Sequence, residues 1–460
     1  MNRLLAGGLV LACLCAGAAG ATDRPLTVVD ANAGKALYIQ ECSGCHGERG
    51  NGAGPAAAFL DPRPRDFTKR MFKLRSTPTG QPPTTDDVLR TIERGIPGTA
   101  MPAFAFLPPE DRRHIAAHVL RLADLLDEPE PAAIPDPGAP PPTSAETIAT
   151  GKQLYADAGC ETCHGPTGKG DGTQEMKDSD GRPIKARDFT SGTFRGGNER
   201  VDLYYRLTTG MDGSPMPGYG DSLDGPERWA LVAFVMSLRS PPAPTPLPAD
   251  PTEAGRVVAG QYGCRGCHVL DDGTGGDVGP DFRLAGQKLD PTWVRTFLHA
   301  PHAYGKLYPW RTYRMPQLAL TDGEIDVMGR YLAATGRRTD APIPVPDVAS
   351  FPAAKVEAGK NTFVLVCAQC HALGKVVETP LASQQGPDLI RVAGRVDYEW
   401  AKRWITDPKA FDPKTKMLIP AALTPDDIDN VRMFVWKTSV EANAAAGGTT
   451  AAVTSPATGG

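Results

Sequence analysis

Four copies of one five-residue motif, Cys-x-x-Cys-His, constrain this chain more than any other feature of its sequence. Two thiols three residues apart on a helical turn can bond to the two vinyl groups of the same porphyrin. The histidine that follows is placed to ligate the porphyrin iron. The pattern therefore predicts four covalently attached c-type haems. The attachment cysteines are Cys42, Cys45, Cys160, Cys163, Cys264, Cys267, Cys367 and Cys370, and the proximal histidines are His46, His164, His268 and His371.

Three other uses of paired cysteines compete with haem attachment. Eight cysteines could build two zinc sites, or they could form four disulfides in an exported protein. A thioredoxin-like redox motif is the third alternative. None of these explains why a histidine follows the second cysteine in every copy, so haem attachment is the preferred interpretation.

The length and charge of the chain limit its domain count and its partners. A chain of 460 residues predicts three or four domains of ordinary size. The net charge is −4 and the sequence pI is about 6.1, so there is no basic surface of the kind that binds nucleic acid. Partners are expected to be redox proteins instead.

The first 21 residues have the pattern of a secretory signal peptide, with an apolar run and an Ala-x-Ala cleavage site that ends at Ala21. This predicts export, and in a bacterium a periplasmic location. Residues 10–13 also resemble a lipobox, so Cys13 is either lipidated and anchored at a membrane surface or removed with the signal peptide. The longest later apolar run, residues 229–238, is too short to span a bilayer. The mature chain is therefore not expected to cross the membrane.

Proline-rich segments divide the rest of the chain into four parts, each with one haem motif. Such segments favour extended, semi-rigid linkers. The linkers lie at 127–142, 240–251 and 340–352. The predicted domains are 27–126, 146–239, 252–338 and 353–440, followed by a disordered Ala/Gly/Thr-rich tail at 441–460.

Each part has the same helical plan, which predicts an all-α fold of four small tandem domains. A glycine lies about three helical turns before each haem histidine, which indicates a helix that leads into the motif. These glycines are Gly34, Gly151, Gly255 and Gly359. An amphipathic helix pattern closes each part, with Thr321 and Thr424 as predicted N-caps in the last two.

The four parts form two pairs. The first two share an Arg-Asp-Phe-Thr motif, at 65–68 and 187–190. The last two share Gly-Pro-Asp, at 279–281 and 386–388, and a later tryptophan-containing helix with Trp293 or Trp400. The order suggests two separate duplications.

A methionine in a turn follows each haem motif and is the predicted sixth ligand of the iron, because His/Met is a recognised haem ligation. These residues are Met101, Met216, Met315 and Met417. Proline follows the first three and stiffens the turn, whereas Met417 lacks it. Met211 is the rival to Met216, and His299 or His302 is the alternative to Met315.

These motifs together resemble the class I cytochrome c family over nearly the whole chain. The resemblance implies a small helical bundle in which a C-terminal helix crosses the helix that carries the haem motif. It also implies that a proline carbonyl accepts a hydrogen bond from the second nitrogen of the haem histidine. This proline would be Pro55 in the first domain, Pro280 in the third and Pro387 in the fourth, and the second domain has no matching proline. Arg65, Arg75 and Arg187 either pair with haem propionates or form ordinary surface ion pairs.

The predicted function is single-electron transfer between respiratory redox partners, with no catalytic residues. Methionine ligation raises the potential relative to bis-histidine ligation, and six-coordinate iron has no free position for a substrate. Two alternatives stay open. One is a peroxidase-like haem enzyme with one open iron, for which Met417 is the weakest ligand. The other is an electron-transfer subunit of a larger membrane oxidoreductase complex.

Overall fold

The computed structural model describes residues 25–240, 246–304, 312–336, 341–379, 385–419 and 422–445. The predicted signal peptide, the lipobox with Cys13 and most of the predicted tail lie outside these residues. Within the described ranges, no helix combines the length and the apolar character needed to cross a bilayer.

The fold consists of four helix pairs, and each pair encloses one haem motif. We call these parts units one to four. In each unit the helix that leads into the motif packs against the last helix of the same unit. The pairs are α1 (Val28–Glu41) with α4 (Pro109–Leu122), α5 (Ala145–Asp157) with α8 (Gly225–Ser237), α9 (Pro251–Gln261) with α12 (Asp322–Thr335), and α13 (Ala353–Leu365) with α16 (Pro425–Ala445).

Each crossing point lies at the glycine that precedes the motif. An ideal Cβ added at Gly34, Gly151 or Gly359 would lie 1.9, 2.0 or 1.9 Å from a backbone oxygen of the opposite helix. At Gly255 it would lie 2.1 Å from the Tyr331 Cγ atom. Only a hydrogen atom fits at these four places, so glycine allows the two helices to come this close.

Shorter elements complete the units. The remaining α-helices are α2 (Ser43–His46), α3 (Thr85–Arg94), α6 (Glu161–His164), α7 (Arg200–Thr209), α10 (Phe282–Lys288), α11 (Pro291–His299), α14 (Tyr398–Thr406) and α15 (Pro408–Phe411). Strands β1 (Met176–Lys177) and β2 (Pro183–Ile184) form a small antiparallel hairpin in unit two, with Met176 opposite Ile184. The structure is therefore mostly helical, which confirms the predicted fold class.

The apolar side chains of each unit form separate cores. The buried clusters around Tyr38, Val258 and Phe363 belong to units one, three and four, and unit two has two smaller clusters around Val232 and Leu231. None of these clusters mixes residues from two units. Each unit therefore has apolar cores of its own.

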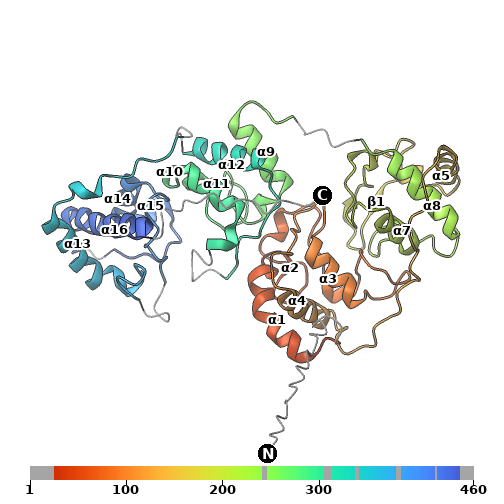
Figure 1. Ribbon diagram of the computed structural model, residues 1–460, viewed down its shortest axis with the longest axis horizontal. Coiled ribbons are helices and arrows are strands. Elements are labelled where there is room, and N and C mark those ends of the chain that lie inside the picture. Colours follow the sequence, from red (N-terminus) through yellow and green to blue (C-terminus); the bar gives the residue numbers. More distant parts are fainter. Residues whose placement is uncertain are drawn as a thin grey trace, which may run out of the picture.

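The units do not follow one another in space as they do in the sequence. Figure 1 shows unit one, in red and orange, between the yellow-green unit two and the green to teal unit three, with the blue unit four at the far end. Units one and two are joined by hydrogen bonds to backbone oxygens: Arg75 Nη2 donates to the Thr209 oxygen (2.8 Å) and Arg206 Nη1 to the Lys73 oxygen (2.7 Å).

Units three and four meet through equivalent residues in, and just before, the tryptophan-containing helix that they share. Leu289 and Val396 form an isolated antiparallel bridge. The Lys288 ammonium lies 5.5 Å from the centre of the Trp400 ring, and the Arg395 guanidinium lies 5.8 Å from the Trp293 ring. Cations at this distance from an aromatic face are attracted to it. Each unit therefore contributes one cation and one indole to the contact.

The predictions for the first linker and for the C-terminal tail can be compared with the described residues. The first linker is extended and lies against the protein, since Ile134 N donates to the Ser76 oxygen (2.7 Å) and Arg200 Nη1 to the Pro141 oxygen (2.7 Å). Helix α16 continues to Ala445, so residues 441–445, which were assigned to the tail, are helical.

Two glycines of helix α9 provide a matched test of the crossing. Replacing Gly255 with alanine should destabilise the protein by about 1–3 kcal/mol, because the new methyl group overlaps Tyr331. Replacing Gly260, which has nothing within 4 Å, should stabilise it by about 0.5–1 kcal/mol through helix propensity. Thermal unfolding of the two variants measures both effects. Equal changes in the two variants would contradict this account of the crossing.

Candidate haem sites

Each Cys-x-x-Cys-His motif folds as a single helical turn. The backbone N–H of the motif histidine donates to the carbonyl of the first cysteine at 2.9–3.0 Å in all four copies. The turn is α-helical in units one and two and 3₁₀-helical in units three and four. A turn of this length places both thiols and the imidazole beside one another, as attachment to one porphyrin requires.

The eight cysteines of the described chain are all free thiols, so the disulfide alternative is not realised. The zinc alternative also fails: across the residues that the structure places, the one group of three or more possible metal ligands is Asp30, Glu110 and His114, without any cysteine. Burial raises the pKa of Cys264 to about 12 and that of Cys367 to about 11. The cause of both shifts is burial of the thiols.

The second nitrogen of each motif histidine faces a backbone carbonyl. The Nδ1 atoms of His46 and His164 lie 3.0 and 3.2 Å from the carbonyl oxygens of Arg65 and Arg187. In the other two units the distances are 2.7 Å from His268 Nδ1 to the Pro280 oxygen and 2.9 Å from His371 Nδ1 to the Pro387 oxygen. A carbonyl only accepts, so Nδ1 carries the proton and Nε2 is left as the ligand atom.

The residues after this carbonyl repeat as well. An aspartate follows and its carboxylate accepts from the backbone N–H two residues later, as at Asp66 and Asp388. The next residue packs on the imidazole: the ring of Phe67 lies 4.6 Å from that of His46, and the ring of Phe189 lies 4.3 Å from that of His164. The carbonyl and the stacked ring together fix the imidazole plane.

This repeat corrects one prediction and answers an open question. Arg65, not Pro55, supplies the carbonyl in unit one, and Arg187 supplies it in unit two. The two motifs that the sequence presented as different, Arg-Asp-Phe and Pro-Asp-Phe/Leu, therefore occupy one structural position. Aligning the four aspartates would have shown this, because the hydrogen bond needs only a backbone oxygen and accepts either side chain.

The histidines are buried, and burial lowers the pKa of His46, His164 and His371, which favours the neutral ring that ligates iron. In units three and four a glycine lies against the ring. A Cβ added at Gly279 would lie 2.4 Å from His268 Cε1, and one at Gly386 would lie 2.3 Å from His371 Cε1. The shared Gly-Pro-Asp motif thus makes room for the imidazole and supplies its acceptor.

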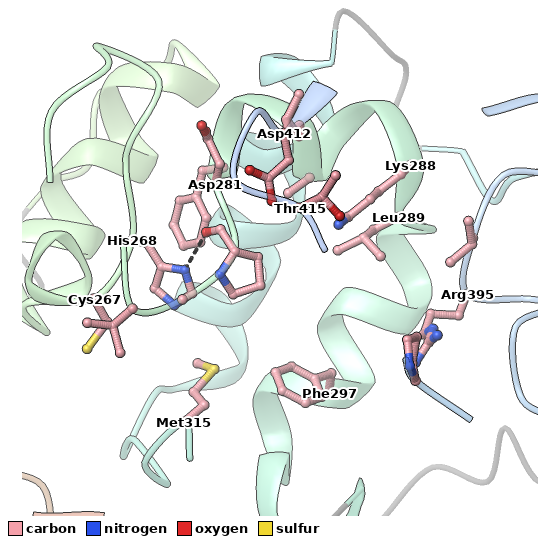
Figure 2. Close-up of a pocket in the computed structure, with 18 of the residues that line it drawn as sticks. Cys267, His268, Asp281, Lys288, Leu289, Phe297, Met315, Arg395, Asp412 and Thr415 are labelled. Atoms are coloured by element: carbon pink, nitrogen blue, oxygen red, sulfur yellow. Dashed lines mark hydrogen bonds between the residues drawn. The ribbon is translucent and has the colours of Figure 1, made fainter. Parts of the chain in front are cut away.

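A cavity of about 1050 Å³ lies beside the motifs of units three and four. Its lining includes His268, Met315, His371 and Met417, together with apolar side chains such as Phe297. Figure 2 shows His268 and Met315 at the same end of this cavity, on different elements, with the dashed bond to the Pro280 carbonyl on the far side of the imidazole. An apolar cavity of this size with the two ligand types at its edge fits a haem.

The predicted ligand loops differ in how they are held. In units one and two the loop closes on itself, with Ile96 N donating to the Met101 oxygen and Met211 N to the Met216 oxygen, both at 3.1 Å. Met211, the rival of Met216, thus occupies the place of Ile96. In unit four the Trp404 indole Nε1–H donates to the Met417 sulfur at 3.0 Å. This bond positions a methionine that lacks the following proline.

Basic side chains gather where units one and two meet. Burial lowers the pKa of each of them, that of Lys73 to about 8 and that of Arg206 to about 10. The arginine of each shared motif reaches into the other unit. A Cβ added at Gly98 of unit one would lie 3.2 Å from a guanidinium nitrogen of Arg187, and one added at Gly213 of unit two would lie 3.0 Å from a guanidinium nitrogen of Arg65. The other members are Arg65, Arg75, Arg187 and Arg195.

The comparisons with known proteins agree with this geometry. Residues 29–119 match the family model of the cbb3-type cytochrome c oxidase subunit III, and residues 148–239 match the cytochrome c model. The chain is a multihaem c-type cytochrome. Cytochromes of this type hold haem c covalently, so this chain is a haem protein with electron-transfer domains.

Two individual proteins are similar to this cytochrome. The cbb3-type cytochrome c oxidase subunit FixP of Azorhizobium caulinodans is 24% identical over 207 residues, which cover 45% of this chain and 58% of that protein. The chain thus spans little more than half the length of this relative. A chain of the Kuenenia stuttgartiensis reducing HAO-like protein complex is 40% identical, with a TM-score of 0.44, over 45% of this cytochrome and 96% of that chain.

Two neighbouring residues of unit four test the role of the carbonyl. Replacing Gly386 with alanine should disturb the ligation of one haem, because the added methyl group overlaps the His371 ring. Replacing Pro387 with alanine should leave the haem spectrum unchanged, since the acceptor is a backbone oxygen. Spectropotentiometry of both variants measures the effect. A normal Gly386→Ala spectrum beside a disturbed Pro387→Ala spectrum would contradict the assignment.

Proposed function

We propose that this cytochrome carries four haems c, one in each unit, and passes single electrons between exported respiratory redox proteins. The observation that carries the proposal is the fourfold repetition of one site: a Cys-x-x-Cys-His turn whose histidine Nδ1 is bound to a backbone carbonyl. Bound haem supplies a reversible one-electron couple at iron. The residues of the chain hold that group, set its ligands and exclude water.

The proposed axial pairs are His46 with Met101, His164 with Met216, His268 with Met315, and His371 with Met417. The shared cavity of units three and four supports the last two, and the closed Met-Pro loops support the first two. His302, the alternative to Met315, stacks on Phe106 at 4.2 Å and lies 3.6 Å from Glu41, which favours a role at the surface between units. The basic residues between units one and two are the proposed partners of the haem propionates.

A location outside the cytoplasm is part of the proposal. It rests on the signal peptide pattern of residues 1–21, with removal of Cys13 or its lipidation as the two outcomes. Attachment within a larger oxidase complex is the second candidate, because the FixP relative is named as a subunit of a cbb3-type cytochrome c oxidase. Co-purification of the chain with a membrane complex would favour that candidate over a free carrier.

Haem stoichiometry is the first test. A pyridine haemochrome assay on the purified chain should count four haems, all retained after denaturation because thioether bonds hold them. Replacing both cysteines of one motif with alanine should remove one haem. A count below four, or haem released on denaturation, would contradict the proposal.

Ligation in unit four is the second test. If Met417 fills the sixth position, the unmodified reduced protein should bind carbon monoxide poorly, and the Met417→Ala variant should bind it at one haem. Met433, on helix α16 of the same unit, is the matched control, since its replacement with alanine should not open any iron. Stoichiometric carbon monoxide binding by the unmodified protein would favour the peroxidase-like alternative.

A further inference from the structure

The contact between units one and three joins parts of the chain that the sequence separates by all of unit two. A glycine of each haem motif takes part in it. A Cβ added at Gly44, within the first motif, would lie 3.4 Å from the Tyr313 ring. One added at Gly266, within the third motif, would lie 2.9 Å from Leu60 and 3.3 Å from Ala56. Each of these two motifs therefore packs against side chains of the other unit, the first against Tyr313 and the third against Leu60 and Ala56.

The residue before the second cysteine explains why these two units meet. It is glycine in units one and three, and it is Thr162 and Gln369 in units two and four. Gly44 and Gly266 expose the backbone of their motifs, so a partner surface can approach the attachment site. Thr162 and Gln369 place a side chain at the same position.

Polar groups hold the same contact. Glu41, directly before the first motif, has only 1% of its side chain exposed and lies 3.7 Å from Arg314 and 3.6 Å from His302 of unit three. Arg314 N also donates to the Gln40 oxygen at 3.0 Å. A carboxylate buried this deeply needs charged or polar partners, and here they come from the other unit.

The large cavity continues through this contact. Its lining includes Cys45 and Ala100 of unit one as well as the motifs of units three and four. Burial and the nearby Cys267 together raise the pKa of Cys45 to about 12. The attachment sulfurs of two sites that are distant in sequence are thus close in space.

From these contacts, and on the basis of the proposed function, we infer that the four haem sites are neighbours in the order two, one, three, four. Unit one contacts both unit two and unit three, and unit four contacts unit three (Figure 1). Units two and four are then the ends of the series. Electrons should therefore enter and leave the series at units two and four. The order in the sequence would instead make units one and four the ends.

Cross-linking with two introduced cysteines tests the order. Every cysteine among the described residues would be bonded to haem in the holoprotein, so among those residues only the introduced thiols react. Phe106→Cys with His302→Cys places one thiol on each side of the contact, where the native rings are 4.2 Å apart. A short bismaleimide should link them within one chain. The control pair, Phe106→Cys with the exposed Val364→Cys of unit four, should not be linked.

A second variant keeps the test informative. Adding Gly266→Gln gives the third motif the residue that unit four already has, so haem attachment should survive while the contact is overfilled. The yield of the 106–302 link should fall roughly tenfold, the factor that corresponds to about 1.4 kcal/mol. Replacing Gln369 with alanine, at the matching position of unit four, should not change it.

The outcomes separate the two proposals. Four haems with no 106–302 link, or a link unaffected by Gly266→Gln, would overturn the order and leave the carrier function standing. Fewer than four haems would overturn the proposed function, whatever the cross-linking shows. Four haems with a link that Gly266→Gln weakens supports both.

Discussion

The close crossing of two helices at one glycine is the constraint on which each unit depends. The first helix ends in the haem motif, so the depth of the crossing decides where the two cysteines and the histidine lie relative to the last helix. A side chain at Gly151 would collide with the backbone at Ala230, and the motif would move away with its helix. The carbonyl that binds the histidine and the loop that carries the methionine are arranged around this fixed position.

Much of each unit could be predicted from the sequence because its signals are local. The motif is one helical turn, the glycine lies three turns before it, and the last helix has an amphipathic pattern with an N-cap such as Thr321. The histidine acceptor could not be assigned reliably, because a backbone oxygen leaves no side-chain signature. Proline at 280 and 387 marked the acceptor by resemblance, whereas Arg65 performs the same task with a different side chain.

The order of the units was not predictable for a related reason. Contacts between units use backbone oxygens, glycines and a few charged side chains, such as Arg75 with Thr209 and Glu41 with Arg314. These residue types occur on every protein surface, so their pattern does not identify a partner. The hydrogen bond from Trp404 to the Met417 sulfur is equally hidden, since tryptophan at that place is also expected as core packing.

The exchanged contacts within each pair of units have a consequence for ancestry. Arg65 reaches the loop at Gly213 while Arg187 reaches the loop at Gly98, and Leu289 pairs with its own counterpart, Val396. Contacts in which residue i meets j and j meets i are the signature of an isologous, two-fold interface. Such contacts are expected if two self-associating one-haem proteins were each duplicated and fused. The present chain would then correspond to two former homodimers. Its linkers would keep the two halves of each former dimer together, whereas separate proteins would have depended on their concentration to associate.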